Sequence, residues 1–434
     1  MKICVLGIDG AAPQVVFRDE RLTNLRRLMD LGVYGLLESV MPPTAIPAWT
    51  CFSTSQDPGS LGMYGPGDVA GLEAAHFPSL QTTFAQNGKK AVLCGIPPAT
   101  PADIDTTGKT QIKERALRAR DDQWQTIQQH FADQGWDFFY SLDTNLEPLQ
   151  RTFWADFDPK HPLYKSGNPD ELVIAEYYQW LDQRIGEMFE YLDDQTIVAV
   201  VSAYGAQRVD GAIAMNEWLM EQGLLVLHEA PTAPTRFEQL KVDWSRTRAW
   251  SEGGECAGIF FNVEGREARG VVPESQYQSL QADLANRIAA LRQPGGERLQ
   301  SLVLMPDETY RNVRGRAPDL MVEFGGLFYR VADAVGYGKI YLPPSEPGLP
   351  ACNHSQYGVF IIAAPNCPLQ GEYEGARLLD LAPTLLDLAG YEIPSSMQGK
   401  SLVAGMEKKA ASGGQDEAEA QRLLHERLAG LGYI

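Results

Sequence analysis

The feature that most constrains the fold of this chain is a series of short apolar runs, several of which lie beside segments with helical periodicity. The first run, Lys2–Ile8, reads KICVLGI and is followed by Asp9 and Gly10. This pattern is typical of a buried parallel strand whose C-terminal end delivers a carboxylate into a loop. Further runs are Ala91–Cys94, Thr196–Ser202, Gly258–Asn262, Leu302–Met305, Leu320–Phe324 and Val359–Ala363, and helix-period segments are Leu22–Leu31, Glu171–Leu192 and Ala376–Leu388.

Strands that alternate with helices predict an α/β fold, with a doubly wound, mostly parallel sheet covered by helices on both faces. Ligands of such folds gather at the C-terminal ends of the strands. We expect one α/β domain over residues 1–405, with cap insertions at approximately 65–172 and 223–350. Residues 406–434 are expected to form a polar connector and a C-terminal helix.

Charge and composition exclude several classes of protein. The 434 residues include 37 Lys+Arg and 56 Asp+Glu, a formal net charge of −19, and this excess argues against a nucleic-acid partner. Hydrophobic residues make up 44% and charged residues 21% of the chain, which is sufficient for a large core. No apolar stretch has the length of a membrane helix, and the N-terminus lacks a leader pattern. We therefore expect a cytoplasmic protein without a membrane partner; a protein partner and the oligomeric state stay open.

Several segments resemble one enzyme superfamily, in the same order along the chain. They read GIDGAAPQVV near the start, then MPPTAIPAWTCFSTSQDPGSLGMYG, WADFDPKHPLY, IFFNVEGREARGVV and ARLLDLAPTLLDLAGYEIPSSMQGKSL. These segments resemble the alkaline phosphatase superfamily, in particular the bacterial type I phosphodiesterases and nucleotide pyrophosphatases. The resemblance implies an alkaline-phosphatase-like core with cap insertions. It also implies hydrolysis of phosphate esters by two divalent metals, usually zinc, that flank a Thr or Ser nucleophile.

The nucleophile that this resemblance implies is missing from its expected place. The family pattern puts a Thr or Ser two residues before the Pro of Pro-Ala-Trp, and that position is Ala45 here. Thr44 is adjacent, but neighbouring side chains of an extended loop point apart, so its use would need a different backbone path.

Most of the implied metal ligands are also replaced. Asp9 is retained, and His354 matches the family's late histidine. Glu147 and Arg151 take the places of Asp and His in Asp-x-x-x-His, and Ala203-Tyr204 replaces Asp-His. A guanidinium stays protonated and has no lone pair for a metal. Because zinc needs three or four protein ligands, we expect no metal cofactor and no two-metal phosphoester hydrolysis.

The replaced residues carry functional groups, which favours a repurposed pocket. In this hypothesis the pocket binds a small anionic biosynthetic intermediate that carries a phosphoryl, sulfuryl, acyl or carboxylate group. His354 acts as general acid or base, Tyr204 donates a hydrogen bond, and Asp9 and Glu147 orient them. Arg151, Thr44 and Asn353 are the expected substrate-binding residues. The pattern favours a metal-independent transferase or lyase over an active two-zinc hydrolase.

Two other readings stay open. In the second reading the chain is a non-catalytic pseudoenzyme that serves as a scaffold or regulator. Arg151 then only pairs with carboxylates that no longer bind a metal, and Tyr204 only fills the space that the metal would occupy. A residual single-metal phosphodiesterase is the third reading. If the repurposed pocket uses covalent chemistry, Thr44 and Cys352 are the candidates for its nucleophile. A repurposed site predicts that Asp9, Arg151, Tyr204 and His354 meet at one open cavity, whereas a scaffold predicts a filled one.

Overall fold

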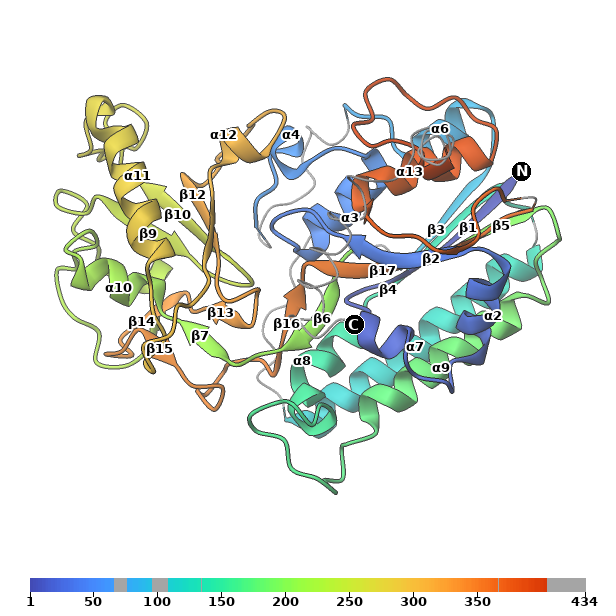
Figure 1. Cartoon of the computed structure of the whole chain (residues 1–434), viewed down its shortest axis with the longest axis horizontal. Helices are drawn as coiled ribbons and strands as arrows, with labels where there is room; N and C mark the ends of the chain where they lie inside the picture. Colours follow the sequence, from blue (N-terminus) through green and yellow to red (C-terminus); the bar gives the residue numbers. More distant parts are fainter. Residues whose placement is uncertain (66–75, 96–107, 134, 366, 404–434) are drawn as a thin grey trace, which may run out of the picture.

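The structure is a computed structural model that describes residues 1–65, 76–95, 108–133, 135–365 and 367–403. It has a main lobe around one large sheet and a second lobe of smaller sheets (Figure 1). The connector and helix expected at 406–434 lie outside the described residues.

The main lobe contains an eight-stranded, mostly parallel sheet, as the sequence predicts. The strand order is β18-β2-β17-β5-β1-β4-β3, and β19 also pairs with β2. β1, β3, β4 and β5 run parallel, whereas β17 runs antiparallel to both β2 and β5. The bounds are β1 Lys2–Ile8, β2 Val33–Glu38, β3 Ala91–Cys94, β4 Phe138–Asp143, β5 Thr196–Ser202, β17 Tyr357–Ala363, β18 Gly371–Glu372 and β19 Ala376–Arg377.

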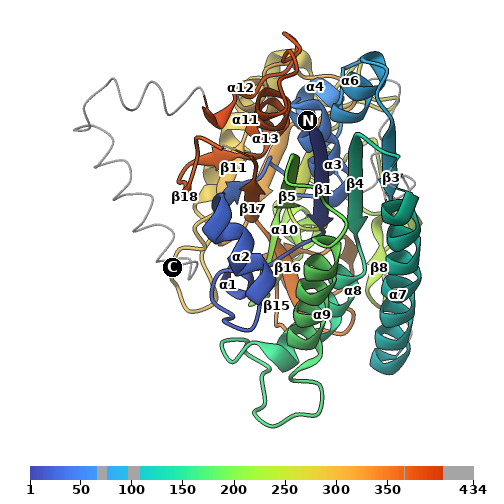
Figure 2. The ribbon, with the colours of Figure 1, turned by 90° about the vertical axis from the view of Figure 1, so that its right-hand side faces the viewer.

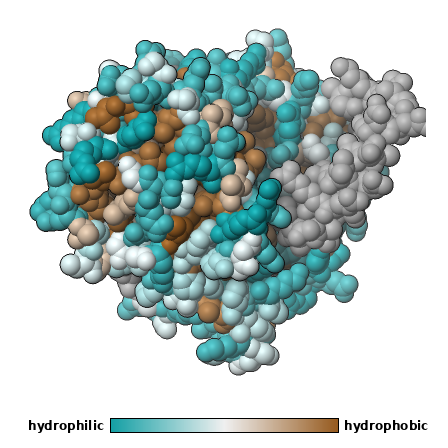
Figure 3. All heavy atoms as spheres, turned by 60° about the vertical axis from the view of Figure 1, so that its left-hand side comes forward, coloured by the Kyte–Doolittle hydropathy of each residue, from teal (hydrophilic) through white to brown (hydrophobic). Residues whose placement is uncertain are grey.

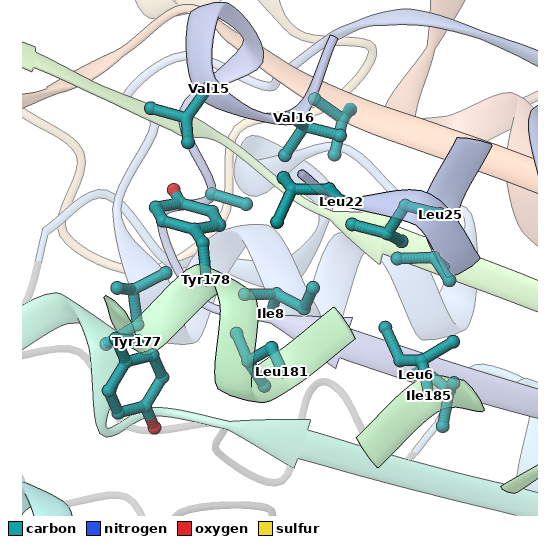
Figure 4. Close-up of a cluster of buried hydrophobic side chains, with 14 of the residues drawn as sticks. Leu6, Ile8, Val15, Val16, Leu22, Leu25, Tyr177, Tyr178, Leu181 and Ile185 are labelled. Carbon is teal, nitrogen blue, oxygen red and sulfur yellow. The ribbon is translucent and has the colours of Figure 1, made fainter. Parts of the chain in front are cut away.

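Helices cover both faces of this sheet. Successive side chains of a strand point to opposite faces, and apolar side chains on each face need to be buried. In β1, Cys4, Leu6 and Ile8 belong to one hydrophobic cluster, and Ile3 and Val5 belong to another. Figure 4 shows Leu6 and Ile8 against side chains of α2 and α9. The first face carries α1 Pro13–Val16, α2 Thr23–Leu31, α7 Lys109–Asp133, α8 Leu146–Phe157 and α9 Val173–Met188, seen together in Figure 2. The second carries α3 Ala45–Thr54, α6 Leu80–Gln86 and α13 Leu378–Leu388, with α4 Pro58–Leu61 after α3.

The small sheets of the second lobe are mostly antiparallel, although β13 pairs parallel with β7, and this corrects part of the sequence prediction. The largest of these sheets has the order β11-β12-β10-β9, and all its pairs are antiparallel. The runs at 258–262, 302–305 and 320–324 therefore belong to a separate sheet, because an apolar run reports burial and not the partner strand. The bounds are β7 Gly211–Ile213, β8 Thr235–Arg236, β9 Ala249–Glu252, β10 Ala257–Phe261, β11 Leu302–Leu304, β12 Leu320–Glu323, β13 Tyr329–Val331, β14 Ala334–Val335, β15 Tyr341–Leu342, α10 Met215–Glu221, η1 Phe237–Gln239, α11 Glu274–Ala289 and α12 Pro306–Thr309.

The domain boundaries differ from those predicted. The range 65–172, expected as a cap insertion, supplies β3, β4 and the helices α6, α7 and α8 of the main lobe. The second lobe begins earlier than residue 223, since Ile213, Met215 and Trp218 already belong to its hydrophobic cluster. Loop-like composition misled the prediction for 65–172, because Pro- and Gly-rich segments flank its two short strands.

A pair of short strands joins the lobes. β6 (Gly205–Arg208) leads from β5 into the second lobe, and β16 (Cys352–Ser355) leads back into β17. The two strands pair antiparallel, with His354 opposite Ala206. The chain therefore passes twice through the region beyond the C-terminal end of β5, which is where the expected site residues gather.

Within the described ranges, no helix combines the length and apolarity that crossing a bilayer requires. Figure 3 shows the face of the second lobe with several hydrophobic groups separated by hydrophilic side chains.

Candidate active site

A cavity of about 1020 Å³ lies between the two lobes, beyond the C-terminal ends of β1 and β5. Its volume is at the upper end of the range typical of small-molecule sites. The lining includes Asp9, Thr44, Ala45, Glu147, Arg151, Tyr204, Glu255, Arg330 and His354, and also Arg115 of α7, Arg236 of β8 and Tyr337. Asp9, Arg151, Tyr204 and His354 thus meet at one open cavity.

Asp9 follows β1 and is held by two hydrogen-bond donors. Its Oδ1 accepts from Trp49 Nε1 at 2.7 Å and from the Tyr204 hydroxyl at 2.5 Å. Burial raises the pKa of the Asp9 carboxyl to about 6, although these two hydrogen bonds act in the opposite direction. Gly10 turns the chain with φ of 68°, which a residue with a side chain adopts only with strain. The carboxyl is therefore costly to ionise and fixed in direction.

The loop after Asp9 is fastened to the neighbouring elements. The Gly10 carbonyl accepts from Gln150 of α8 at 2.8 Å, and the Ala11 amide donates to Ser202 Oγ at 2.8 Å. The Ala12 amide donates to the Tyr178 hydroxyl of α9 at 2.7 Å. These bonds join β1, β5, α8 and α9, so the carboxylate is positioned by rigid parts of the fold.

His354 of β16 has a defined tautomer in its neutral form. Its Nδ1 lies 2.7 Å from the Pro43 carbonyl oxygen, which only accepts, so Nδ1 carries the proton. The Tyr204 ring stacks on the imidazole, with centroids 4.1 Å apart and planes at 28°. Nε2 has no hydrogen-bond partner in the described part of the chain, and Glu147 Oε1 lies 3.7 Å away, beyond hydrogen-bond length. The Nε2 lone pair is thus free to accept a proton.

Acidic and basic side chains alternate at the base of the cavity. Arg151 Nη1 lies 3.0 Å from Glu147 Oε1, four residues earlier on α8, and 3.9 Å from Glu255 Oε1. Arg330 of β13 is buried and donates to Glu255 Oε1 at 3.0 Å and to Asn353 Oδ1 at 2.8 Å. Two guanidinium groups and two carboxylates therefore balance in a network that joins both lobes.

This pairing keeps both glutamates ionised despite burial. Burial raises the pKa of the Glu147 carboxyl, but the Arg151 charge and the nearby His354 outweigh it and lower that pKa to about 2. Burial likewise raises the pKa of Glu255, while the charges of Arg330, His354 and Arg151 bring it well below its usual range. Burial lowers the Arg151 pKa, yet Glu147 and Glu255 together move it upward.

Helix α3 points its N-terminus at the cavity, where Thr44, Ala45 and Ile46 are all in the lining. Thr44 is the N-cap residue, with extended backbone angles of −106° and 147°. An N-cap hydroxyl normally accepts from the amide two or three residues into the helix. The third helical residue is Pro47, which has no amide hydrogen, and Thr44 Oγ1 is buried without a hydrogen-bond partner among the residues described.

Six of the seven predicted site residues line the cavity: Asp9, Thr44, Glu147, Arg151, Tyr204 and His354. Asn353 lies behind the wall, fully buried. Its amide donates to the carbonyls of Leu327 and Glu255, and its oxygen accepts from Arg330. Side chains alternate along β16, so Asn353 points away from the face that His354 presents. Asn353 therefore positions Arg330 and does not contact a ligand in the cavity.

Cys352, considered above as a nucleophile, is packed into the hydrophobic cluster under α8 and α9. Burial raises the pKa of its thiol to about 12, and Glu147 adds to this rise. A thiol of this kind is protonated and shielded at neutral pH, and only the thiolate attacks. The structure therefore does not support Cys352 as a nucleophile.

We expect Cys352 to resist alkylation in the folded protein. With iodoacetamide at pH 8, peptide mass spectrometry is expected to find Cys352 unmodified until the protein is unfolded in guanidinium. Cys367, which is partly exposed, is the internal comparison and should react faster. Equal rates at the two thiols would show that Cys352 is accessible.

Sequence reasoning missed three residues of the site. Glu255 follows the Gly253-Gly254 turn before β10, and Arg330 lies in the short strand β13. They are far apart in sequence, so their ion pair left no local pattern. Trp49 is buried in the core, and its indole N–H donates to Asp9. A buried Trp whose N–H needs a partner was the one available signal.

The donors present do not fit the metals that the resemblance implies. Within the described ranges, no group of three or more His, Cys, Asp and Glu side chains is arranged to hold a metal ion. Glu147 is paired with Arg151, Tyr204 donates to Asp9, and Ala203 packs in the core cluster beside α3. A cationic guanidinium beside the carboxylate repels a metal cation.

Comparisons with known proteins agree with this fold. Residues 3–337 match the sequence profile of the "Type I phosphodiesterase / nucleotide pyrophosphatase" family. Human ectonucleotide pyrophosphatase/phosphodiesterase 5 has a similar structure, with a TM-score of 0.55 and 11% sequence identity over 92% of this chain and 97% of that chain. At this identity the likeness concerns the fold alone.

Shorter matches connect the chain to curated enzymes. It is 37% identical over 90 residues to the 2,3-bisphosphoglycerate-independent phosphoglycerate mutase of Listeria monocytogenes, which is 20% of this chain and 16% of that enzyme. The same enzyme of Clostridioides difficile is 36% identical over 98 residues, 22% of this chain and 19% of its own length. The chain thus matches less than a fifth of these relatives. Because the profile match extends over most of its length, the chain belongs to the type I phosphodiesterase / nucleotide pyrophosphatase family of the alkaline phosphatase superfamily.

Proposed function

We propose that this family member binds a small anionic molecule in the cavity between its lobes, and acts on it without the two divalent metals. Arg151 supplies the positive charge that faces the ligand's phosphoryl, sulfuryl, acyl or carboxylate group. His354 exchanges protons with this group. Tyr204 stacks on the His354 imidazole and donates to Asp9, so these two residues keep the imidazole in position. The reaction class that suits these groups is metal-independent transfer or elimination.

The observation that carries this proposal is the pairing of the acidic side chains. Glu147 contacts Arg151, Glu255 contacts Arg330, and Asp9 accepts from Tyr204 and Trp49. Each carboxylate that a cation would use already has a donor. Meanwhile Arg151 lines the cavity and its side chain is 27% exposed, so its positive charge lies where an anion can approach it.

The first test is the zinc content of the intact protein. We expect well under one zinc per chain by elemental mass spectrometry, after equilibration with excess zinc and desalting. Retained zinc requires three or four protein donors, and arginine supplies none. A result near two metals per chain would overturn the proposal and restore the two-metal phosphodiesterase reading.

The second test is the binding of inorganic phosphate by calorimetry in the presence of EDTA. Arg151→Gln is expected to weaken binding roughly ten-fold or more, because a charge-assisted contact is lost. Arg287→Gln is the matched control, since Arg287 also pairs with an acid four residues earlier on a helix but lies in the second lobe. Equal phosphate affinity in wild type and Arg151→Gln contradicts the role of Arg151. Folded wild type that binds no anion favours the scaffold reading.

A further inference from the structure

We propose that a second, smaller cavity of this protein binds a small monovalent anion, of which chloride is the simplest example. This cavity lies in the main lobe between α7 and α9, against β1 and β4, and its volume is about 50 Å³. It shares no lining residue with the cavity between the lobes. The inference therefore goes beyond the proposed function and does not depend on it.

Two buried hydrogen-bond donors of this cavity lack an acceptor. Trp124 of α7 is 8% exposed, and its Nε1 makes no hydrogen bond to the residues that the structure describes. Arg184 of α9 likewise has a buried Nε without a partner among them. Both residues line the cavity, and the guanidinium carbon of Arg184 lies 5.6 Å from the centre of the Trp124 ring. Because a buried N–H without an acceptor is unfavourable, the pair indicates a bound species that accepts hydrogen bonds.

The acceptors of the cavity, in contrast, are already used. The two Asp143 carboxylate oxygens accept from the Tyr177 hydroxyl at 3.0 and 2.8 Å. The Ser141 hydroxyl also lines the cavity and can turn its hydrogen toward a bound acceptor. Of the lining side chains, only Trp124 and Arg184 have a buried polar atom without a partner in the described part of the chain. A water molecule donates as well as accepts, whereas an anion only accepts, so this balance favours an anion.

Two guanidinium groups give the cavity a positive potential. Their carbons lie 4.4 Å, for Arg120, and 5.7 Å, for Arg184, from the centre of the Trp180 ring. The acids that pair with them, Asp121 and Glu187, have side-chain exposures of 55% and 40%, against 15% and 26% for the two arginines. Solvent screens an exposed carboxylate more than a buried cation. The positive charge is therefore felt mainly on the inner side of the two helices, where the cavity lies.

The size and polarity of the cavity select the kind of anion. One water molecule needs about 10–15 Å³ of such space, so the cavity admits a species of only a few atoms. Leu6, Ile8, Leu181 and Ile185, which are labelled in Figure 4, contribute apolar side chains to the lining. Apolar surroundings make a doubly charged ion costly to bury, and the Asp143 carboxylate in the same lining adds repulsion. A halide or a small monovalent oxoanion fits, and sulfate does not.

The experiment follows the indole N–H groups of the full chain by NMR, with its 8 tryptophans ¹⁵N-labelled. Chloride replaces gluconate, which is too large for the cavity, at constant ionic strength. We expect the Trp124 signal, identified by its loss in Trp124→Phe, to shift and saturate with a dissociation constant on the order of 10 mM, since two charge-assisted hydrogen bonds hold the ion. A Trp124 signal that stays in place across the titration overturns the proposal and leaves a site for water.

Variants separate the hydrogen bond from the charge. Arg184→Lys keeps the positive charge and removes the Nε–H, so the dissociation constant read from the Trp124 signal should rise roughly ten-fold. An unchanged constant would remove Arg184 Nε from the site. Chloride should also raise the thermal midpoint of the wild type, because an ion that binds only the folded chain stabilises it. Trp124→Phe should lose this rise.

Two controls test whether the effect belongs to this cavity. Trp136 is also buried with an Nε1 that lacks a partner among the described residues, but it does not line the cavity. Trp136→Phe should keep the chloride response, and equal shifts of the Trp124 and Trp136 signals would show a general salt effect and contradict the site. Arg151→Gln should leave the Trp124 response intact. Its loss in that variant would place the chloride in the cavity between the lobes and overturn this inference.

Discussion

Arg330→Met is expected to destabilise the protein by about 3–5 kcal/mol, the range found when one partner of a buried ion pair is removed. Arg330 and Glu255 are both buried, with side-chain exposures of 8% and 5% and an Nη2 to Oε1 distance of 3.0 Å. Methionine fills much of the arginine volume, so the cost comes from the charge. Glu255 would keep Arg151 at 3.9 Å as its remaining cation, and Asn353 Oδ1 would lose its donor.

Urea denaturation at pH 7.5 measures this effect, and a double variant tests its cause. Arg330→Met with Glu255→Leu should recover most of the lost stability, because a buried pair replaced by apolar side chains of similar volume is often neutral or stabilising. Arg118→Met, which breaks an exposed pair with Glu114 on α7, should cause no measurable loss. A double variant as unstable as the single one would mean that the arginine stem, and not its charge, supports this region.

Asp9→Asn is expected to stabilise the protein above pH 7. The change in unfolding free energy that it causes should be about 3 kcal/mol more favourable above pH 7 than near pH 4. The folded-state pKa of Asp9 is raised by burial to about 6, from an ordinary value of 3.8. Such a group favours folding fully below pH 4, and this contribution is lost as the pH rises through 6. Asparagine Oδ1 can accept the same bonds from Trp49 and Tyr204 without becoming charged.

The measurement is the difference in unfolding free energy between wild type and Asp9→Asn at pH values from 4 to 8. Groups shared by the two proteins cancel, so the difference should rise mainly between pH 4 and pH 7. If the difference in unfolding free energy does not change with pH, the Asp9 carboxylate is better solvated than its buried position indicates. The same variant should lose the ligand-directed function of the pocket, since destabilising charges persist at functional sites.

Local patterns predicted four of the eight strands of the central sheet, β1, β3, β5 and β17, and missed β2, β4, β18 and β19. The run Lys2–Ile8 coincides with β1 and Thr196–Ser202 with β5, because both are buried on two faces and read as continuous apolar segments. The run at 258–262 was read correctly as a strand and assigned to the wrong sheet. β2 escaped prediction because its sequence VYGLLE includes a glycine and half-buried positions. Pairing partners are set by topology, which a window of the sequence does not contain.

The site was predictable where the family pattern fixed a position, and not where the second lobe supplied it. Asp9, Glu147 and His354 follow from register against the motifs, and all three line the cavity. Glu255 and Arg330 come from segments without a motif, and the packing of one lobe on the other brings them together. The sequence prediction did not include Glu255 and Arg330. It therefore paired Arg151 with Glu147 alone and described only part of the charge at the site.

The antiparallel direction of β17 has a consequence for how this protein can change. Val359 of β17 pairs with Ser202 of β5, so the whole second lobe lies between two adjacent strands, as the loop of a β-hairpin does. The entropy of closing a loop grows only slowly with its length. Evolution can therefore lengthen, shorten or exchange this lobe, and with it one wall of the cavity, while the strand register of the core stays the same. New substrate preference can arise in this architecture by replacing the loop of a hairpin.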